Sequence, residues 1–228
     1  MRLPSPVIER HGDFYVCRDD LLDGGTKRRA LINYLPVFNS AHFFYAGTIF
    51  GSGGWALAEA CNDLELDCTL LLASNDYRPQ WTDKFSKQIE WHAPITVAAL
   101  YDICRLKAAE TGGIALPLGF DDPIFKNSMV KTLKETDVNP SEIWRSCVSG
   151  TLVNAAQAAW QAKPMNAVCV AKNHGELGTA KKYQAAEKYH QFSRDIPPYP
   201  SNIFSDAKIW SFARQFALKD ALIWNTSA

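Results

Sequence analysis

Lys27 is the residue of this sequence whose surroundings most directly suggest chemistry. It follows the turn-forming residues Asp23-Gly24-Gly25 and opens a helix-like stretch, so its ammonium group can lie over a pocket formed by the turn. Two more cations, Arg28 and Arg29, stand beside it. Neighbouring positive charge and partial burial both lower the pKa of a lysine from about 10.4, which favours Schiff-base chemistry. A solvated surface lysine is the other interpretation of this turn.

Two glycine-containing turns are candidates for holding an anion. Gly51-Ser52-Gly53-Gly54 and Ser149-Gly150-Thr151 each lie between an expected strand and an expected helix. Free backbone N–H groups and the helix dipole at such a position favour a phosphate or a carboxylate. Glycine and serine also occur there as helix caps alone, so each turn by itself allows both interpretations.

The elements that must position these residues alternate between strands and helices. Short apolar runs predict strands at residues 14–17, 42–46, 68–73, 95–97, 114–116, 142–148, 167–170 and 221–224. Helices are expected at residues 27–38, 55–63, 100–110, 126–135, 151–160, 181–190 and 208–218. Such alternation predicts an α/β fold with a mainly parallel twisted sheet flanked by helices.

The composition is that of an ordinary folded protein and argues against several function classes. The 228 residues include 24 lysines and arginines and 24 aspartates and glutamates, so no net charge attracts nucleic acid or an anionic membrane. No apolar run approaches the roughly 18 residues of a membrane span, and the N-terminus lacks a secretory pattern, so we expect a cytoplasmic protein. The six cysteines form no Cys-x-x-Cys pair and the five histidines are dispersed, so we expect buried reduced thiols and no metal.

Residues 16–31, VCRDDLLDGGTKRRAL, resemble the segment around the cofactor lysine in fold-type-II pyridoxal-phosphate enzymes. These are the tryptophan synthase β-like enzymes, and the resemblance is strongest for the branch of aminocyclopropane-carboxylate deaminase and D-cysteine desulfhydrase. It implies pyridoxal 5'-phosphate as the cofactor, held by Lys27 as an aldimine. It also implies a shortened tryptophan synthase β-like fold, with residues 1–228 as one compact unit. Within that unit about 46–130 would form a reduced small domain and the remainder the large domain.

Two further turns fit the same family, with one departure. The family places a Ser-Asn pair at the head of a helix to meet the substrate carboxylate and the cofactor ring hydroxyl. Here Ser52 is followed by Gly53, which predicts a wider pocket and puts the ring-hydroxyl contact in question. The turn formed by Ser149, Gly150 and Thr151 is similar to a shortened form of the family's phosphate loop, which offers backbone N–H groups and two hydroxyls.

The C-terminal part of the chain supplies two more candidates for cofactor contacts. Ser205-Asp206-Ala207-Lys208 is similar to the family segment whose acidic residue pairs with the pyridine nitrogen, which implies this role for Asp206. Residues 222–226 resemble the strand and threonine turn that close the site, which implies Thr226. An acid at the pyridine nitrogen would keep it protonated and make the ring a strong electron sink. A helix N-cap is the other interpretation of Asp206.

The resemblance implies an enzyme that acts at the α-carbon of an amino acid or aminoacyl group, with Lys27 and Ser52 as catalytic residues. Deamination, elimination and decarboxylation all stay open at this point. Because the chain is shorter than is usual in the family, a second subunit of a homodimer would contribute lid closure and substrate selection.

Other functions fit parts of the sequence. Ser149-Gly150-Thr151 also fits the sugar-pyrophosphate loop of a phosphoribosyltransferase, although residues 145–148 stand where that class carries an acidic pair. The short length and Gly53 would suit a non-catalytic cofactor-binding relative. Decarboxylation would suit an amino acid attached to a larger molecule, such as a modified nucleotide. Lysines and tyrosines interleave in residues 172–189, a pattern that can bind nucleic acid. Two glutamates in this segment favour a solvated helix face instead.

Overall fold

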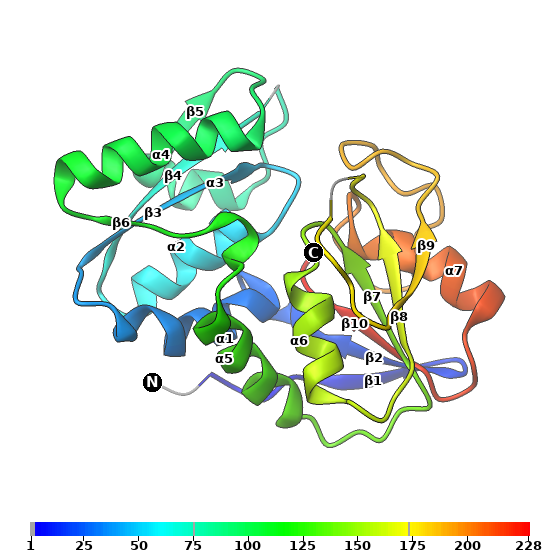
Figure 1. Cartoon of the computed structure of the whole chain (residues 1–228). Coiled ribbons are helices and arrows are strands. Elements are labelled where there is room, and N and C mark those ends of the chain that lie inside the picture. Colours follow the sequence, from blue (N-terminus) through cyan, green and yellow to red (C-terminus); the bar gives the residue numbers. More distant parts are fainter. Residues whose placement is uncertain (1–2, 75, 173) are drawn as a thin grey trace.

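The computed structural model describes residues 3–74, 76–172 and 174–228, which form two sheets with helices packed around them (Figure 1). The larger sheet has six strands in the order β1-β2-β10-β7-β8-β9. These strands are β1 (Ile8–His11), β2 (Phe14–Arg18), β7 (Ile143–Cys147), β8 (Met165–Cys169), β9 (Lys181–Gln184) and β10 (Leu222–Asn225). β1 and β2 pair antiparallel and the other neighbours pair parallel. The predicted mainly parallel α/β fold is confirmed.

The smaller sheet has four strands, all parallel, in the order β5-β4-β3-β6. Its strands are β3 (His42–Thr48), β4 (Asp67–Ala73), β5 (Ile89–His92) and β6 (Ile114–Ala115). It is built from one continuous stretch of chain, which overlaps the small domain expected at about 46–130. Those domain boundaries stay a prediction.

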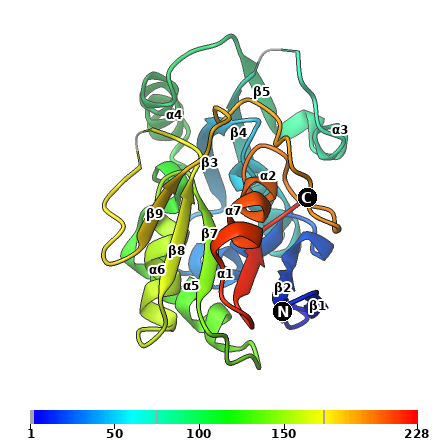
Figure 2. The ribbon, with the colours of Figure 1, turned by 90° about the vertical axis from the view of Figure 1, so that its right-hand side faces the viewer.

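Helices cover both faces of each sheet. They are α1 (Gly25–Tyr34), α2 (Gly53–Asp63), α3 (Trp81–Lys84), α4 (Val97–Thr111), α5 (Pro123–Lys134), α6 (Thr151–Ala159) and α7 (Ile209–Phe216). In the six-stranded sheet, Trp144 and Val168 pack with Ile209 of α7 on one face, and Figure 2 shows α6 on the opposite side from α7. In the four-stranded sheet, Phe44 and Leu71 pack against α4, while α2 lies on the other face.

Two glycines fix how α1 begins. Gly24 has φ +77° and Gly25 has φ +65°, a left-handed conformation that side chains other than glycine rarely adopt. A Cβ on Gly25 would lie 2.0 Å from the carbonyl oxygen of Thr226, so only glycine lets α1 approach the end of β10 this closely. The N–H of Thr26 donates to that carbonyl at 3.1 Å. The glycine pair therefore holds the start of α1 against the last strand.

Two of the expected elements are wrong. Residues 95–97 are not a strand, because the Thr96 hydroxyl caps α4 by accepting a hydrogen bond from the N–H of Ala99, and the helix begins at Val97. Residues 181–190 are not a charged helix: Lys181–Gln184 is an edge strand paired with β8. Charged side chains are common on such edges because they oppose further strand pairing.

The remaining sequence expectations concern side chains. All six cysteines are free and buried. In the described part of the chain, no three histidine, cysteine, aspartate or glutamate residues are grouped as a metal site would need. None of the helices described has the length and apolar character of a membrane span. In the basic segment, the Tyr183 ring packs on Trp144 and Phe216, with ring centroids 4.9 and 5.5 Å away, so it is occupied inside the fold.

Candidate active site

A cavity of about 530 Å³ opens between the two sheets, at the carboxyl ends of β3, β7 and β10. Carboxyl ends of parallel strands are where ligands bind in α/β proteins. We call its two sides the small-sheet wall and the large-sheet wall. The small-sheet wall comprises residues 45–48, 51–53, 96–98 and 118–119. The large-sheet wall comprises residues 27, 146, 148–150, 152–153, 171, 189, 205–206 and 226. Of the predicted site residues, Lys27, Ser52, Ser149, Gly150, Asp206 and Thr226 line this one cavity.

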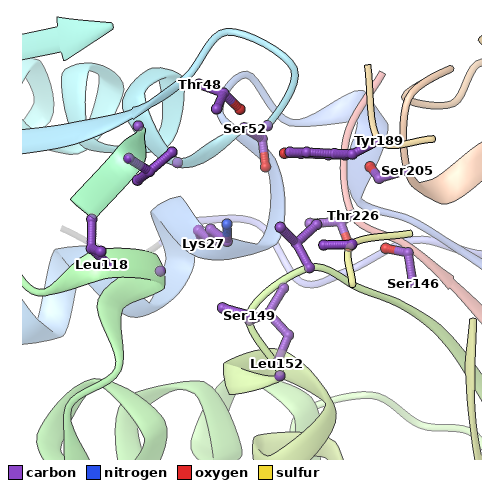
Figure 3. A pocket seen from close by; sticks show the side chains of 18 of the residues that line it. Lys27, Thr48, Ser52, Leu118, Ser146, Ser149, Leu152, Tyr189, Ser205 and Thr226 are labelled. Atoms are coloured by element: carbon purple, nitrogen blue, oxygen red, sulfur yellow. The ribbon is translucent and has the colours of Figure 1, made fainter. Parts of the chain in front are cut away.

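Lys27 lies near the centre of the cavity, between Ser52 on one side and Ser149 on the other (Figure 3). Its Nζ is 5.9 Å from the centre of the Phe120 ring. Burial lowers the pKa of Lys27 to about 8, with a further downward contribution from the positive charge of Arg145 and an upward one from Asp206. Far more of this amine is therefore neutral and nucleophilic near pH 7 than in an exposed lysine.

The two cations expected beside Lys27 are turned away from it. Arg28 binds both carboxylate oxygens of Asp63 at 2.7 and 2.8 Å. Arg29 donates to Asp19 at 2.9 Å. The prediction that Arg28 and Arg29 lower the pKa of Lys27 is therefore wrong, because their charges are neutralised by carboxylates. The cation that acts on Lys27 comes from β7.

Asp206 is a fully buried carboxylate on the large-sheet wall. Ser146 donates its hydroxyl to Oδ1, and the N–H of Thr226 donates to Oδ2 at 3.1 Å. Burial raises the pKa of Asp206, while Ser146, Arg145 and the backbone N–H groups of Thr226 and Ser227 oppose that rise. The N-cap interpretation is wrong, because Asp206 is the first residue of the helical turn at 206–208 and its carboxylate accepts from Ser146 and Thr226 instead.

Arg145 lies beneath the site and is almost completely buried, with 1% of its surface exposed. Its Nη2 donates to the Thr226 hydroxyl at 3.3 Å, and its guanidinium stands over the Trp224 ring at 5.4 Å. Its Nε and Nη1 have no hydrogen-bond partner among the described residues. Burial lowers the pKa of Arg145 to about 10, against an upward pull from Asp206. An incompletely paired positive charge thus sits next to the lysine and the carboxylate.

The turn before α6 has the geometry of an anion site. Gly150 has φ +97°, and the N–H groups of Thr151, Leu152 and Val153 start the helix without donating to any described residue. The Ser149 hydroxyl lies 3.2 Å from that of Thr151 and lines the cavity, whereas Thr151 is buried behind it and does not line the cavity. Free N–H groups at a helix start, with a hydroxyl beside them, suit a phosphate.

The turn before α2 faces the same cavity from the small-sheet wall. Ser52 stands at the start of α2, and the N–H groups of Gly53, Gly54 and Trp55 donate to no described residue. The wider pocket predicted from Gly53 is wrong, because the Tyr45 ring fills the space beside this glycine. A Cβ on Gly53 would lie 2.2 Å from the Tyr45 hydroxyl oxygen.

Comparison with solved structures identifies the architecture. The structure of an ACC deaminase homologue superposes with a TM-score of 0.82 at 15% identity, covering 99% of this chain and 90% of that one. Threonine deaminase isoform 2 from Solanum lycopersicum gives 0.73 at 11% identity, covering 98% and 83%. Diaminopropionate ammonia lyase from Escherichia coli gives 0.64 at 12% identity, covering 94% and 78%.

The chain has the tryptophan synthase β-like fold. The predicted fold is thereby confirmed, and it is the fold of the fold-type-II pyridoxal-phosphate enzymes. No protein-family model matches the chain, and no curated protein sequence matches it.

Several cavity residues of this tryptophan synthase β-like chain were not among the sequence candidates, including Tyr45, Ser146, Tyr189 and Ser205. Tyr189 belongs to the basic segment, yet its hydroxyl lies on the cavity side, within 2.5 Å of where a Cβ on Gly51 would be. Ser146, Tyr189 and Ser205 come from a strand end and from loops remote from Lys27 in sequence, so no local pattern reveals them. A signal existed for Tyr45, because glycines at 47 and 53 leave room for a large neighbour.

Proposed function

We propose that this chain is a pyridoxal 5'-phosphate-dependent enzyme acting at the α-carbon of an amino acid or aminoacyl group, with Lys27 as the cofactor lysine. The observation that carries the proposal is the Lys27 amine: it opens into the cavity with a pKa lowered to about 8 and faces a buried carboxylate. A phosphoribosyltransferase would leave this lysine without a role.

The residues present fit the cofactor. A cavity of about 530 Å³ is within the usual range for a small-molecule site. The free N–H groups at the start of α6 and the Ser149 hydroxyl would hold the phosphate. Gly119, with φ +64°, belongs to this cradle, since a Cβ there would lie 2.5 Å from the Ser149 hydroxyl oxygen. Asp206 and Thr226 would hold the pyridine nitrogen from the large-sheet wall.

Each wall would then have a separate task. When bound, pyridoxal phosphate supplies an electron sink for negative charge at the α-carbon. Lys27 would hold the cofactor and move the α-proton at its Nζ, for which a pKa of about 8 is suited to neutral pH. Ser52 and the free N–H groups of α2 would bind and orient the substrate carboxylate. Asp206, held by Ser146 and the Thr226 N–H, would keep a negative charge next to the ring.

Deamination or elimination is the reaction class that we favour. Two similar structures are of proteins described as a deaminase or a deaminase homologue, and a third is of an ammonia lyase. These names belong to those proteins, and decarboxylation has no comparable support. A homodimeric state and a cytoplasmic location are further parts of the proposal that rest on the sequence alone.

Borohydride trapping of the cofactor tests the proposal. We expect purified protein with added pyridoxal phosphate to show a visible absorption band that Lys27→Ala and Lys27→Arg both abolish. After reduction and digestion, mass spectrometry should find the label on Lys27. Lys208 is an internal control, because burial also lowers its pKa but its Nζ donates to the carbonyl of Lys188, outside the cavity. Labelling that spreads over exposed lysines, or a band that survives Lys27→Ala, would contradict the proposal.

A further inference from the structure

Tyr45 stands in the middle of β3, and its side chain reaches across the small-sheet wall to the start of α2. The residue is 7% exposed and lines the cavity. Its ring stacks on that of Phe120, with centroids 4.9 Å apart and planes inclined by 23°. Lys27 Nζ lies 5.9 Å from the same Phe120 ring. Tyr45 and the reactive amine are therefore neighbours across one aromatic side chain.

Two glycines, Gly47 and Gly53, leave room for the Tyr45 ring because they have no side chain. A Cβ on Gly47 would lie 2.7 Å from Tyr45 Cε1, and a Cβ on Gly53 would lie 2.2 Å from its hydroxyl oxygen and 2.7 Å from Cζ. All three distances are too short for real contacts, so any larger residue at 47 or 53 requires Tyr45 to move. The hydroxyl of Tyr45 thus occupies the place where a side chain on residue 53 would start.

The Tyr45 hydroxyl is available as a donor. It makes no hydrogen bond with any residue that the structure describes, although its ring is firmly packed. Burial raises the pKa of Tyr45, so the phenol keeps its proton through the neutral range. A hydroxyl without a protein partner, on a residue that lines the cavity, can donate to a ligand or to water.

We propose that the Tyr45 hydroxyl contacts the ring oxygen of bound pyridoxal phosphate, in place of a side chain at position 53. This rests on the proposed function, and it makes Tyr45 a cofactor-binding residue that comes from a strand instead of the head of α2. Gly53 then leaves the space that the Tyr45 hydroxyl occupies, so a change at either residue affects the other.

Cofactor affinity and absorbance in Tyr45→Phe provide the first test. The variant keeps the ring that packs on Phe120 and removes only the hydroxyl. We expect about tenfold weaker binding of pyridoxal phosphate by equilibrium dialysis, the loss of one hydrogen bond to a charged oxygen. We also expect the balance between the visible and near-ultraviolet absorbing forms to shift toward the latter, because the ring oxygen loses a donor. Tyr34→Phe is the matched control: Tyr34 is also a buried tyrosine but does not line the cavity.

Substitutions at both Tyr45 and Gly53, alone and combined, give a second test. Gly53→Asn alone places a side chain on top of the Tyr45 hydroxyl, and we expect it to lose most cofactor binding. Tyr45→Ala with Gly53→Asn removes the collision and supplies an amide donor at position 53, so binding should recover above that of either single variant. Circular dichroism on all four proteins shows whether each is folded.

The possible results separate the two proposals. A Lys27-dependent band in the wild type with unchanged affinity and spectrum in Tyr45→Phe overturns the role of Tyr45 and leaves the proposed function standing. No such band in the wild type overturns both. A tenfold loss in Tyr45→Phe with recovery in the double variant supports both, because a merely structural effect of Tyr45 would not be rescued from position 53.

Discussion

The two walls of the cavity differ in charge. Lys27 and Asp206, the charged residues among those that line it, both belong to the large-sheet wall, and Arg145 lies directly beneath them. The small-sheet wall presents neutral groups, among them the hydroxyls of Tyr45 and Ser52. Moving protons and stabilising charge require ionisable groups, whereas orienting a ligand requires donors in fixed places. The contrast suggests that the charged groups of the reaction lie on the large-sheet wall, while the small-sheet wall contributes neutral donors that orient the ligands.

The replacement of a family side chain at Gly53 falls on the small-sheet wall. On the large-sheet wall, Lys27 and Asp206 match the family pattern, while on the small-sheet wall Gly53 replaces asparagine. The structure explains the replacement by the position of Tyr45. Removing the charge of Asp206 on the large-sheet wall should therefore damage turnover, whereas removing a hydroxyl on the small-sheet wall should damage binding.

Asp206→Asn should have the largest effect. It keeps the size of the side chain but removes the negative charge that faces Lys27 and Arg145. We expect turnover of an amine substrate to fall on the order of 10²–10³-fold, as when a fixed electrostatic group is removed from an active site. The Lys27-dependent band should persist. Steady-state kinetics with Ser146→Ala as a milder companion, which removes one hydrogen bond to the carboxylate, measures this. If turnover of Asp206→Asn stays within a few-fold of wild type, the charge on the large-sheet wall does not carry the reaction chemistry.

The fold was largely predictable because its signals are local. Apolar runs such as 68–73 predict buried parallel strands, and the structure has them. The errors arose where a local pattern is ambiguous. Residues 95–97 are all β-branched, but the cap at Thr96 makes Val97 the first residue of a helix. Lys181 to Gln184 are polar because they form an edge strand.

The site was predictable only where its residues lie in recognisable turns. Lys27, Ser52 and Ser149 stand next to glycines at helix starts, which a sequence shows directly. Arg145 could not be predicted in this way, because no glycine turn marks it in the sequence. It acts on Lys27 only in the folded chain, where β7 places Arg145 beneath Lys27. The partners of Arg28 and Arg29 were equally hidden, since Asp63 and Asp19 lie in other elements.

Ser52→Ala should have a smaller effect, on the other wall. Ser52 lines the cavity at the start of α2, where we propose that the substrate carboxylate binds. Loss of one hydrogen bond to a charged group should weaken substrate binding by about tenfold. The cofactor band should keep its position and intensity. Titration of the band with an amino acid substrate measures the binding. If Ser52→Ala instead abolishes the band, then the small-sheet wall is needed for the cofactor lysine itself, and the assignment of tasks is incorrect.

The smallest expected effect concerns the pH dependence of Lys27. Only the neutral amine attacks an aldehyde, and the pKa of Lys27 is lowered from 10.5 to about 8. The rate of pyridoxal phosphate capture should therefore rise with pH up to about 8 and then level off, whereas an exposed lysine would continue to gain up to about 10.4. Stopped-flow absorbance across this range gives the midpoint.

Arg145→Met tests how the large-sheet wall sets that midpoint. The positive charge of Arg145 disfavours protonated Lys27, so its removal should raise the pKa of Lys27 and move the capture profile to higher pH by a fraction of a unit. Burial lowers the pKa of Arg145 itself to about 10, which means that the folded protein holds this charge less favourably than the unfolded chain does. Urea denaturation should therefore find the unfolding free energy unchanged or raised by about 1 kcal/mol, despite the lost contact with Thr226. If the midpoint does not move, burial alone lowers the pKa of Lys27. The only charge on the large-sheet wall that acts on Lys27 would then be that of Asp206, which raises the pKa.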